Sequence, residues 1–448
     1  MEGKAAASAC LGQAPITSFP VGTFSIVFNL FYRTSVILFC LILPDLAFSY
    51  SFQTHEQLID LVWTDTIKPL LKRRFPNLNE ADLVRAHGYA YGGSAIQDLG
   101  YYPFGNQFFS NLTHYVRSGD FVQSLFRHAR NANELAFAIG ALSHYVGDTV
   151  GHSDAVNPAV ATEFPKLAKK FGPSVNYAEA PHAHVRAEFA FDINEASKRH
   201  LAPSAYLRHV GLNVPYALLA QAFRETYGLE VGPVLGKRRP VVQSYRFAVR
   251  SLLPRVAYAE VVLHRNSFPP EPQTPAAELF RKELARTEFE AGWNQFRKKP
   301  GFKTYSLAAL IFILPKIGPL SQLSIRGPQP STVERYVERV NRATASMREL
   351  LAQFDKALSL ANRDLDTGDR VKPGGYRLTD QTYAKLLDEI TRSAGRDVPV
   401  SLKEDLLSYY ADPNAPISTK SNRKQWERVQ SELAVLQGIS TQPKQMEP

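Results

Sequence analysis

Three ligand-type side chains follow one another at steps of four residues in Ser143-His144-Tyr145-Val146-Gly147-Asp148-Thr149-Val150-Gly151-His152. The stretch lies in the apolar run from Glu134 to Val150, whose length and composition predict a buried helix. At about 100° per residue, His144, Asp148 and His152 would share one helix face. At roughly 1.5 Å of rise per residue, His144 and His152 would lie about 12 Å apart, so the spacing indicates a cluster of more than one metal ion.

The alternative is an ordinary buried helix whose polar side chains are hydrogen-bonded. Two glycines argue against this alternative. Gly147 and Gly151 each precede a ligand-type residue, and in a helix interior each destabilises the helix by about 1 kcal/mol relative to alanine. Their presence is explained if other groups approach the helix closely there. Eight of the 11 histidines lie between His55 and His184. Histidines that could bind metal together with the helix are therefore available elsewhere in the first half of the chain. We expect the functional site to lie in that half.

The composition is that of a folded protein with a surplus of positive charge. The 448 residues are 44% hydrophobic and 21% charged, which excludes fibrous and wholly disordered classes and allows one large domain or two. The net charge of +10 favours an anionic partner such as a phospholipid surface or nucleic acid. Lysine and arginine are scattered apart from Lys237-Arg238-Arg239, so charge alone supports only nonspecific attraction.

Residues 1–49 are expected to be a signal peptide or another targeting segment. Arg33 precedes the apolar run Val36–Leu43, and small residues then lead to a predicted cleavage after Ser49. The sequence thus predicts a secreted or periplasmic protein; an uncleaved anchor is the alternative, although charges and proline interrupt the apolar stretch. Both cysteines lie in this segment, so zinc in the mature protein would be held by His, Asp and Glu.

Two candidate ligands precede the central helix. His55 lies in the first turn of a predicted helix for which Thr54 and Gln57 are spaced as a capping box, and a surface histidine is the alternative. Asp98 lies in the glycine-rich stretch 85–105. This stretch predicts a shaped loop, a usual place for functional groups.

Helical patterns carry the remaining candidates. His114 belongs to the pattern that begins at Asn111. His184 and Glu188 are one turn apart on one helix face, which lets an imidazole and a carboxylate share a metal ion. Taken alone, such a pair is more often an ordinary helix contact.

Together these residues resemble the zinc-dependent phospholipase C family, and the central helix is also similar to the N-terminal domain of glycosylphosphatidylinositol-specific phospholipase D. The positions that match in order and type lie within residues 50–200 and are His55, Asp98, His114, His144, Asp148, His152, His184 and Glu188. The resemblance implies an all-α, multi-helix domain of the zinc-dependent phospholipase C or P1-nuclease-like kind, with additional C-terminal helices. It also implies up to three zinc ions and hydrolysis of phosphodiester bonds in phospholipids.

The resemblance implies a role for each position. The first zinc set would be Asp98, His114, His144 and Asp148, and the second would be His152, His184 and Glu188. A third ion would lie on His55, the second oxygen of Asp148, and the processed N-terminal amine and carbonyl. Asp98 matches the carboxylate proposed in the family to activate water, and is therefore the catalytic candidate.

This chain departs from the family's pattern in two places. Family members begin at a metal-binding tryptophan well ahead of their first histidine, whereas the predicted terminus Tyr50 lies five residues before His55. The step from Asp148 to His152 is shorter than in the secreted bacterial phospholipases, although it fits the phospholipase D relative. The first departure concerns the third ion, and the second concerns the choice of headgroup.

No catalytic pattern is found beyond residue 200, and the chain there is expected to be an addition to the catalytic domain. Closely spaced prolines after residue 268 mark the best candidate boundary. The sequence therefore predicts a catalytic domain over residues 50–264, a helical C-terminal extension over 265–440 that packs on it, and a disordered tail over 441–448.

Two patterns stand out in that extension. Apolar residues from Thr332 to Asn362 keep helical spacing and predict a long amphipathic helix that packs on the first half or on a partner chain. The stretch Asp364-Leu365-Asp366-Thr367-Gly368-Asp369 is similar to a calcium loop, but its glycine is one place early and no glutamate closes it. A turn is therefore favoured.

The sequence thus predicts an exported, all-α, zinc-dependent phosphodiesterase that hydrolyses phospholipids, with a membrane surface as a candidate place of action. A single-strand nuclease or nucleotidase with the same three-zinc site is an alternative, with nucleic acid the less favoured partner. A zinc-stabilised binding protein without turnover is another. The headgroup preference and the oligomeric state stay open.

Overall fold

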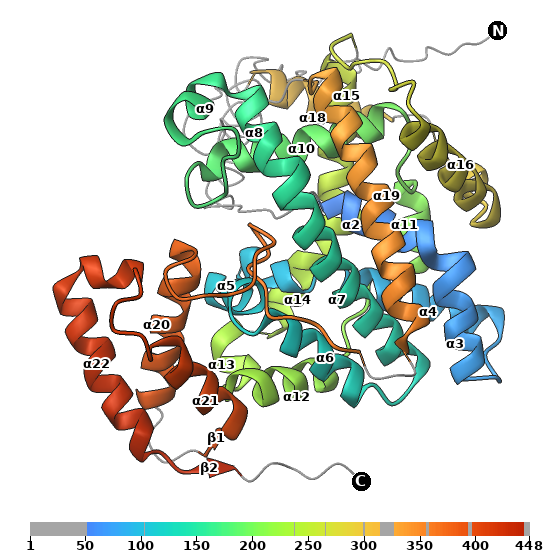
Figure 1. Ribbon diagram of the computed structural model, residues 1–448. Helices are drawn as coiled ribbons and strands as arrows, with labels where there is room; N and C mark the ends of the chain where they lie inside the picture. Colours follow the sequence, from blue (N-terminus) through green and yellow to red (C-terminus); the bar gives the residue numbers. More distant parts are fainter. Residues whose placement is uncertain are drawn as a thin grey trace, which may run out of the picture. The chain divides into compact units, whose positions relative to one another are not determined.

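Helix α7 (Ala132–Gly151) is the central element, and α2, α4, α6 and α19 all pack against it (Figure 1). Sixteen of its 20 residues are buried, which identifies a core helix rather than an amphipathic surface helix. The side chain of Asn131 begins the helix by accepting hydrogen bonds from the backbone N–H groups of Asn133 and Glu134. The predicted buried helix over residues 134–150 is confirmed.

The structure is a computed structural model. It describes residues 52–102, 104–236, 238–264, 266–298, 301–313, 327–354, 358–392 and 397–442. The expected signal segment and its cleavage site, with residues 50 and 51, lie outside the described residues, as does the part of the expected tail from 443 to 448.

Helices follow one another throughout the first part of the chain. Their bounds are α2 (Phe52–Val62), the π-helix η1 (Trp63–Ile67), α3 (Lys68–Arg74), α4 (Glu80–Gly93), the 3₁₀ helix η2 (Gln97–Tyr101), α5 (Gln107–Tyr115), α6 (Ser118–His128), α7, the π-helix η3 (His152–Val156), α8 (Asn157–Glu163), α9 (Pro165–Phe171), α10 (Pro181–Ser197), α11 (Ser204–Val210), α12 (Tyr216–Tyr227), α13 (Val231–Leu235), α14 (Arg238–Phe247), the π-helix η4 (Ala248–Leu252) and α15 (Leu253–His264).

The second part is helical as well, so the expected all-α class is confirmed. Its elements are α16 (Pro275–Glu290), α17 (Trp293–Phe296), α18 (Phe302–Ile313), α19 (Pro330–Ala352), α20 (Arg377–Arg392), β1 (Val398–Pro399), α21 (Val400–Tyr409), the 3₁₀ helix η7 (Ser418–Ser421), α22 (Arg423–Gly438) and β2 (Thr441–Gln442). The two short strands pair in parallel, with Val398 opposite Thr441. Thr441 and Gln442 open the segment expected to be a disordered tail, and here they form β2.

Two glycines let α4 and α7 pack closely. A Cβ atom on Gly93 would lie 2.0 Å from the carbonyl oxygen of Phe137, and one on Gly140 would lie 2.1 Å from the carbonyl oxygen of Ala90. The expectation of a loop over residues 85–105 is therefore wrong in part, because α4 continues to Gly93 and η2 follows it. There, glycine permits helices to touch and does not form a turn.

Thr54 lies inside α2 and joins it to two later helices. Its hydroxyl donates to Oδ1 of Asp192 on α10 at 3.2 Å and lies 2.9 Å from the hydroxyl of Tyr336 on α19. The predicted capping box at Thr54 and Gln57 is wrong, because the helix already includes residue 52. This hydroxyl connects buried helices, which a cap at a helix end would not do.

The C-terminal half contacts the first half directly. Figure 1 shows α19 alongside α7, and Arg348 on α19 donates to the carbonyl oxygen of Leu61 and pairs with Asp65. The described residues, from Phe52 onward, belong to one compact unit. The long helix expected up to Asn362 ends at Ala352. Within the described ranges, no helix combines the length and apolar character needed to cross a membrane.

We expect the substitution Gly93→Ala to destabilise the protein, because the new methyl group would overlap the backbone of α7. The free energy of unfolding should fall by about 1–3 kcal/mol, as is usual for overpacked sites, and the urea midpoint gives the measurement. Gly438→Ala on α22 is the matched control, because nothing lies within 4 Å of its Cβ position. Equal stability of both variants would contradict this account of the α4–α7 contact.

Candidate metal centre

The structure brings all eight predicted ligand positions into one buried region, where α2, η2, α5, α7, η3 and α10 meet. Each of these residues is at most 2% exposed. They form three groups in which the donor atoms lie within 4.8 Å of one another: His55 with His144 and Asp148, Asp98 with His114 and His144, and His152 with His184 and Glu188. His144 belongs to two groups, which therefore adjoin.

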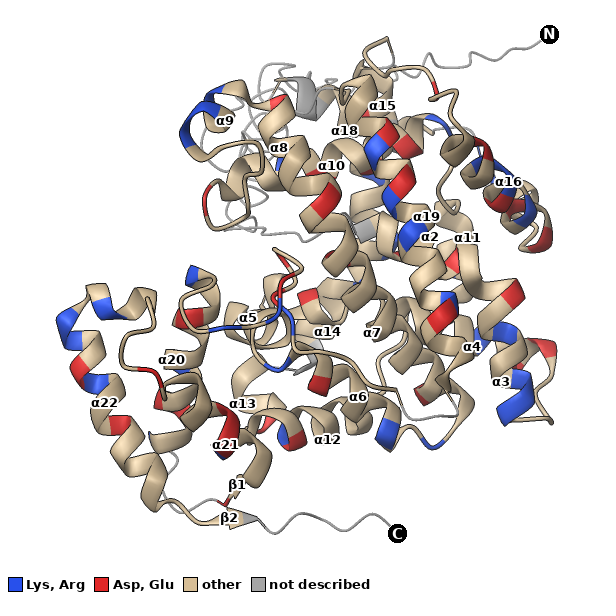
Figure 2. Ribbon diagram, viewed as in Figure 1, with Lys and Arg blue, Asp and Glu red and all other residues tan. Residues whose placement is uncertain are grey.

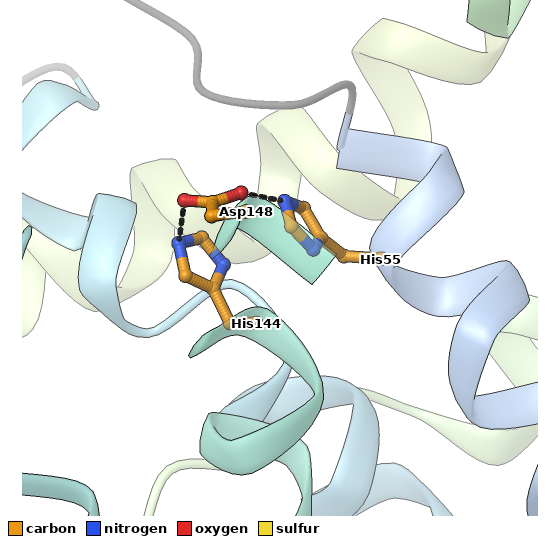
Figure 3. A group of neighbouring side chains, drawn as sticks. All are labelled: His55, His144 and Asp148. Carbon is orange, nitrogen blue, oxygen red and sulfur yellow. Dashed lines mark ion pairs between the residues drawn. The ribbon is translucent and has the colours of Figure 1, made fainter. Parts of the chain in front are cut away.

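Asp148 lies between two histidines (Figure 3). Its Oδ1 is 3.2 Å from Nε2 of His55, and its Oδ2 is 3.1 Å from Nε2 of His144. Oδ2 is also 3.4 Å from Nε2 of His114. Each carboxylate oxygen thus faces different ring nitrogens, so this side chain can contact two adjacent cations at once.

Gly147 makes room for the approach of α2 to the centre. A Cβ atom at this position would lie 3.2 Å from Nδ1 of His55 and 2.8 Å from Cδ1 of Leu58. The rings of His55 and His144 stack with centroids 4.2 Å apart. The expectation that other groups approach the central helix closely at Gly147 is confirmed.

His114 and His144 face each other through ring nitrogens that carry no proton when the rings are neutral. Nδ1 of His114 lies 2.7 Å from the carbonyl oxygen of Ser110, and Nδ1 of His144 lies 2.9 Å from that of Ser94. Because a carbonyl oxygen only accepts, each Nδ1 carries the proton. The two Nε2 lone pairs then point at each other across 3.3 Å. Such lone pairs repel, so a proton or a metal cation is needed between them.

The group around His152 has the same property. Its Nδ1 donates to the carbonyl oxygen of Leu365 at 3.1 Å, so Nε2, which lies 3.1 Å from Oε1 of Glu188, has a free lone pair when the ring is neutral. Nε2 of His184 lies 3.3 Å from the same oxygen. Nε2 of His184 and Oε2 of Glu188 are buried and make no hydrogen bond within the described part of the chain. A cation would satisfy these atoms.

The helix changes its geometry at this group. At His152 the α-helix α7 passes into the π-helical turn η3. Single π turns are frequent at functional sites, where they realign side chains. Here the turn begins at the ligand candidate that lies farthest along the central helix.

Electrostatics favour charged side chains in this region. Burial by itself would raise the pKa of Asp148, but His144 and His152 hold the pKa of this carboxyl well below its usual range. Burial would lower the pKa of His114, but Asp148 and Asp98 raise it to about 10. The neighbouring carboxylates also raise the pKa of His152 well above its ordinary value, so protons on His114 and His152 balance the carboxylates when no metal is bound. A metal ion must displace such protons to bind.

The donor set fits zinc. Neutral imidazole and carboxylate are zinc ligands, and a centre without sulfur is compatible with catalytic zinc. Nε2 of His114 and Nε2 of His144 lie 3.3 Å apart, an arrangement that a divalent cation can stabilise once the protons are displaced. The residues present could therefore hold metal.

The sequence did not reveal the contribution of the stretch 364–369. It is a turn, as favoured, but it lies against His152, which precedes Leu365 by 213 positions. The acidic pattern of this stretch was visible in the sequence. Nothing in its spacing connected it to the histidines, because only the fold brings them together.

Comparison with known proteins agrees with this chemistry. The chain matches the family described as "Zinc dependent phospholipase C" over residues 54–232. The resemblance inferred from the sequence is thereby confirmed for this segment, which contains all eight ligand positions. The comparisons with curated proteins and with solved structures found no match.

Zinc binding to the metal-free protein is expected to release protons. The pKa of His114, about 10, lies above its ordinary value of 6.5, so this histidine is protonated at neutral pH and must lose its proton to bind a metal. The apparent zinc affinity should therefore rise with pH up to about 10. Titration calorimetry in buffers of different ionisation enthalpy measures the released protons.

The variant His128→Ala provides the control. His128, the last residue of α6, pairs with the partly exposed Glu225 and belongs to none of the three groups. Its replacement should leave the proton release unchanged. Zinc uptake without any proton release would refute the account of the His114 environment.

Proposed function

We propose that this protein is a zinc-dependent hydrolase that cleaves phosphodiester bonds of phospholipids, in the manner of a phospholipase C. One observation carries the proposal. Buried imidazole nitrogens and carboxylate oxygens face one another across gaps of 3.1 to 3.4 Å, and all of them lie within the segment that matches the zinc-dependent family.

The eight side chains would hold up to three ions. The first set is Asp98, His114, His144 and Asp148, the second is His152, His184 and Glu188, and the third combines His55 with the other oxygen of Asp148. The observed groups support this division, because Asp148 presents one oxygen to His55 and the other to His144. Bound zinc would supply positive charge that offsets the charge of the phosphodiester and makes an attacking water more acidic.

Asp98 is the proposed proton acceptor for the attacking water. It is buried, and its Oδ1 lies 3.4 Å from Nε2 of His114 and 4.0 Å from Nε2 of His144. Burial would raise the pKa of Asp98, but these two histidines lower it below its ordinary value. The carboxylate is therefore ionised at neutral pH and able to accept a proton.

Backbone carbonyl groups would hold the histidine rings for this task. The carbonyl oxygens of Ser94, Ser110 and Leu365 each accept the Nδ1 proton of one ring. Nε2 of each ring is thereby directed into the centre. Such outer contacts fix the tautomer and orientation of metal-binding histidines.

The proposed substrate surface is an anionic or zwitterionic phospholipid membrane. Figure 2 shows Lys and Arg spread over many helices, with a group on α9. Lys166, Lys169 and Lys170 of this helix are exposed. Lysine side chains near a membrane surface are attracted to anionic lipid headgroups, which supports a lipid surface as the place of action.

We also propose that the protein is exported and processed. The support is the arrangement of Arg33, the apolar run Val36–Leu43 and the small residues before Tyr50. A processed N-terminus close to His55 would add an amine and a carbonyl to the third set of ligands.

The substitution Asp98→Asn should abolish most of the hydrolysis, because an amide cannot accept the proton. The rate of phosphocholine and diglyceride release from phosphatidylcholine vesicles is expected to fall about a hundredfold to ten-thousandfold. Zinc content should be nearly kept, since His114, His144 and Asp148 remain. Atomic absorption on the purified variant measures the metal.

Asp412→Asn is the matched control, because Asp412 is exposed and lies outside the three groups. The wild-type assay separates the proposal from its rivals. If the protein releases acid-soluble nucleotide from single-stranded DNA and does not hydrolyse phospholipid, the proposed phospholipase activity is wrong and the protein is a nuclease. Tightly bound zinc with neither product would indicate a binding protein.

Expression in a secreting bacterial host should give a mature protein that begins at Tyr50. Intact mass and N-terminal sequencing identify the terminus, and a metal count on the same sample tests whether processing completes the third set. An intact N-terminus on exported protein would disprove the predicted cleavage after Ser49.

A further inference from the structure

A turn from the C-terminal half reaches the proposed metal centre. We call residues 362–370 the C-terminal turn; they lie outside the segment that matches the family. The backbone N–H of Asp364 donates to the carbonyl oxygen of Asp369 at 2.9 Å, and that of Gly368 donates to the carbonyl oxygen of Asp364 at 2.7 Å. Arg363 and Arg370 pair as an antiparallel bridge. The turn is thus held by its own backbone.

Leu365 joins the turn to two of the histidine groups. Its backbone N–H donates to the carbonyl oxygen of His114 at 3.1 Å, and its carbonyl oxygen accepts from Nδ1 of His152 at 3.1 Å. His114 and His152 belong to different groups. The buried residue Leu365 therefore holds both the backbone of His114, in one group, and the ring of His152, in another.

Asp366 places a carboxylate beside the same ring. Its Oδ1 lies 3.6 Å from Nδ1 of His152. Its Oδ2 accepts hydrogen bonds from the hydroxyls of Tyr115 at 2.9 Å and Tyr376 at 2.6 Å, and its backbone carbonyl accepts one from Asn157 at 2.8 Å. Asp366 is 3% exposed. The carboxylate cannot turn away from the ring without losing the hydrogen bonds from the two tyrosine hydroxyls.

Gly368 allows the turn to lie this close to the central helix. It has a φ of 74°, in the left-handed region that favours glycine. A Cβ atom there would lie 2.5 Å from the carbonyl oxygen of Thr149 and 3.2 Å from Cβ of Ser153. Thr149 and Ser153 flank His152 on the helix. The contact between turn and helix therefore depends on glycine at this position.

We propose that Asp366, together with the carbonyl group of Leu365, is a positioning residue that directs Nε2 of His152 toward His184 and Glu188. The inference rests on the proposed metal centre and adds the C-terminal half of the chain to it. A carboxylate beside the Nδ1–H of a metal-binding histidine fixes its tautomer and makes the Nε2 lone pair a stronger ligand for the metal ion. The segment that matches the family would then lack part of what holds its second group of ligands.

The rival explanation is a purely structural role for Asp366. In that case its carboxylate would serve only to anchor Tyr115 and Tyr376. Loss of this anchor would destabilise the protein equally with and without metal. A positioning role predicts a loss of metal affinity at the group of His152.

The substitution Asp366→Asn in the full chain tests the inference. Asparagine keeps the size of the side chain and one oxygen for the tyrosine hydroxyls, but it removes the charge beside His152. We expect the affinity for one zinc ion, the ion held by His152, His184 and Glu188, to fall about 10- to 100-fold in competition with a chelator. The melting temperature measured in excess chelator should fall as well, because the charged carboxylate accepts from two tyrosine hydroxyls, so the zinc affinity decides between the two roles.

Asp369→Asn is the matched control, since Asp369 is an exposed carboxylate in the same turn. It should bind zinc as the wild type does. Gly368→Ala provides a second variant, which displaces the whole turn and leaves the charge of Asp366 in place. Its affinity for the same zinc ion should fall as well.

The outcomes separate this inference from the proposed function. A wild-type protein that binds zinc, with unchanged affinity in Asp366→Asn and in Gly368→Ala, overturns the positioning role alone. An equal fall of melting temperature with and without metal, at unchanged affinity, also overturns it in favour of the anchor. A wild-type protein that binds no zinc overturns the metal centre and with it this inference.

Discussion

Buried imidazole nitrogens and carboxylate oxygens that face one another, and that need a proton or a cation between them, dominate this structure. The Nε2 atoms of His114 and His144 are 3.3 Å apart, and each ring already donates its other nitrogen to a backbone carbonyl. Buried polar groups without a partner carry a large desolvation cost. Either protons or cations must therefore be present, and the fold that buries these side chains becomes coupled to what they bind.

The helical scaffold satisfies this constraint by close packing of helices. Gly93 and Gly140 let α4 approach α7, and Gly147 makes space for the ring of His55. The donors come from elements that are far apart in sequence, so small shifts of a helix would separate them. A closely packed core resists such shifts and so keeps the buried histidines and carboxylates in place within an apolar helix bundle.

The C-terminal half takes part in this arrangement. Its helix α19 packs along α7 and contacts α2, and its turn near Asp366 contacts His152. The family match ends at residue 232, well before these elements. The segments added after it therefore support the ligand region and do not form a separate unit beside it.

The sequence predicted the helical class, the buried central helix and the residues that meet at the centre, because apolar periodicity and the types and order of histidines and carboxylates are local properties. It was wrong in part about the loop over residues 85–105 and wrong about the capping box at Thr54. In both places a local signal was overridden by packing, since glycine and threonine there serve contacts with other helices.

The sequence by itself thus determined which side chains are candidates to hold metal and that a helix would carry the central ones. Only the tertiary structure decided which atoms face one another, how the two oxygens of Asp148 are divided between His55 and His144, and that Leu365 and Asp366 lie against His152. The physical reason is distance along the chain. Contacts between residues hundreds of positions apart depend on how whole helices pack, and no local pattern encodes that packing.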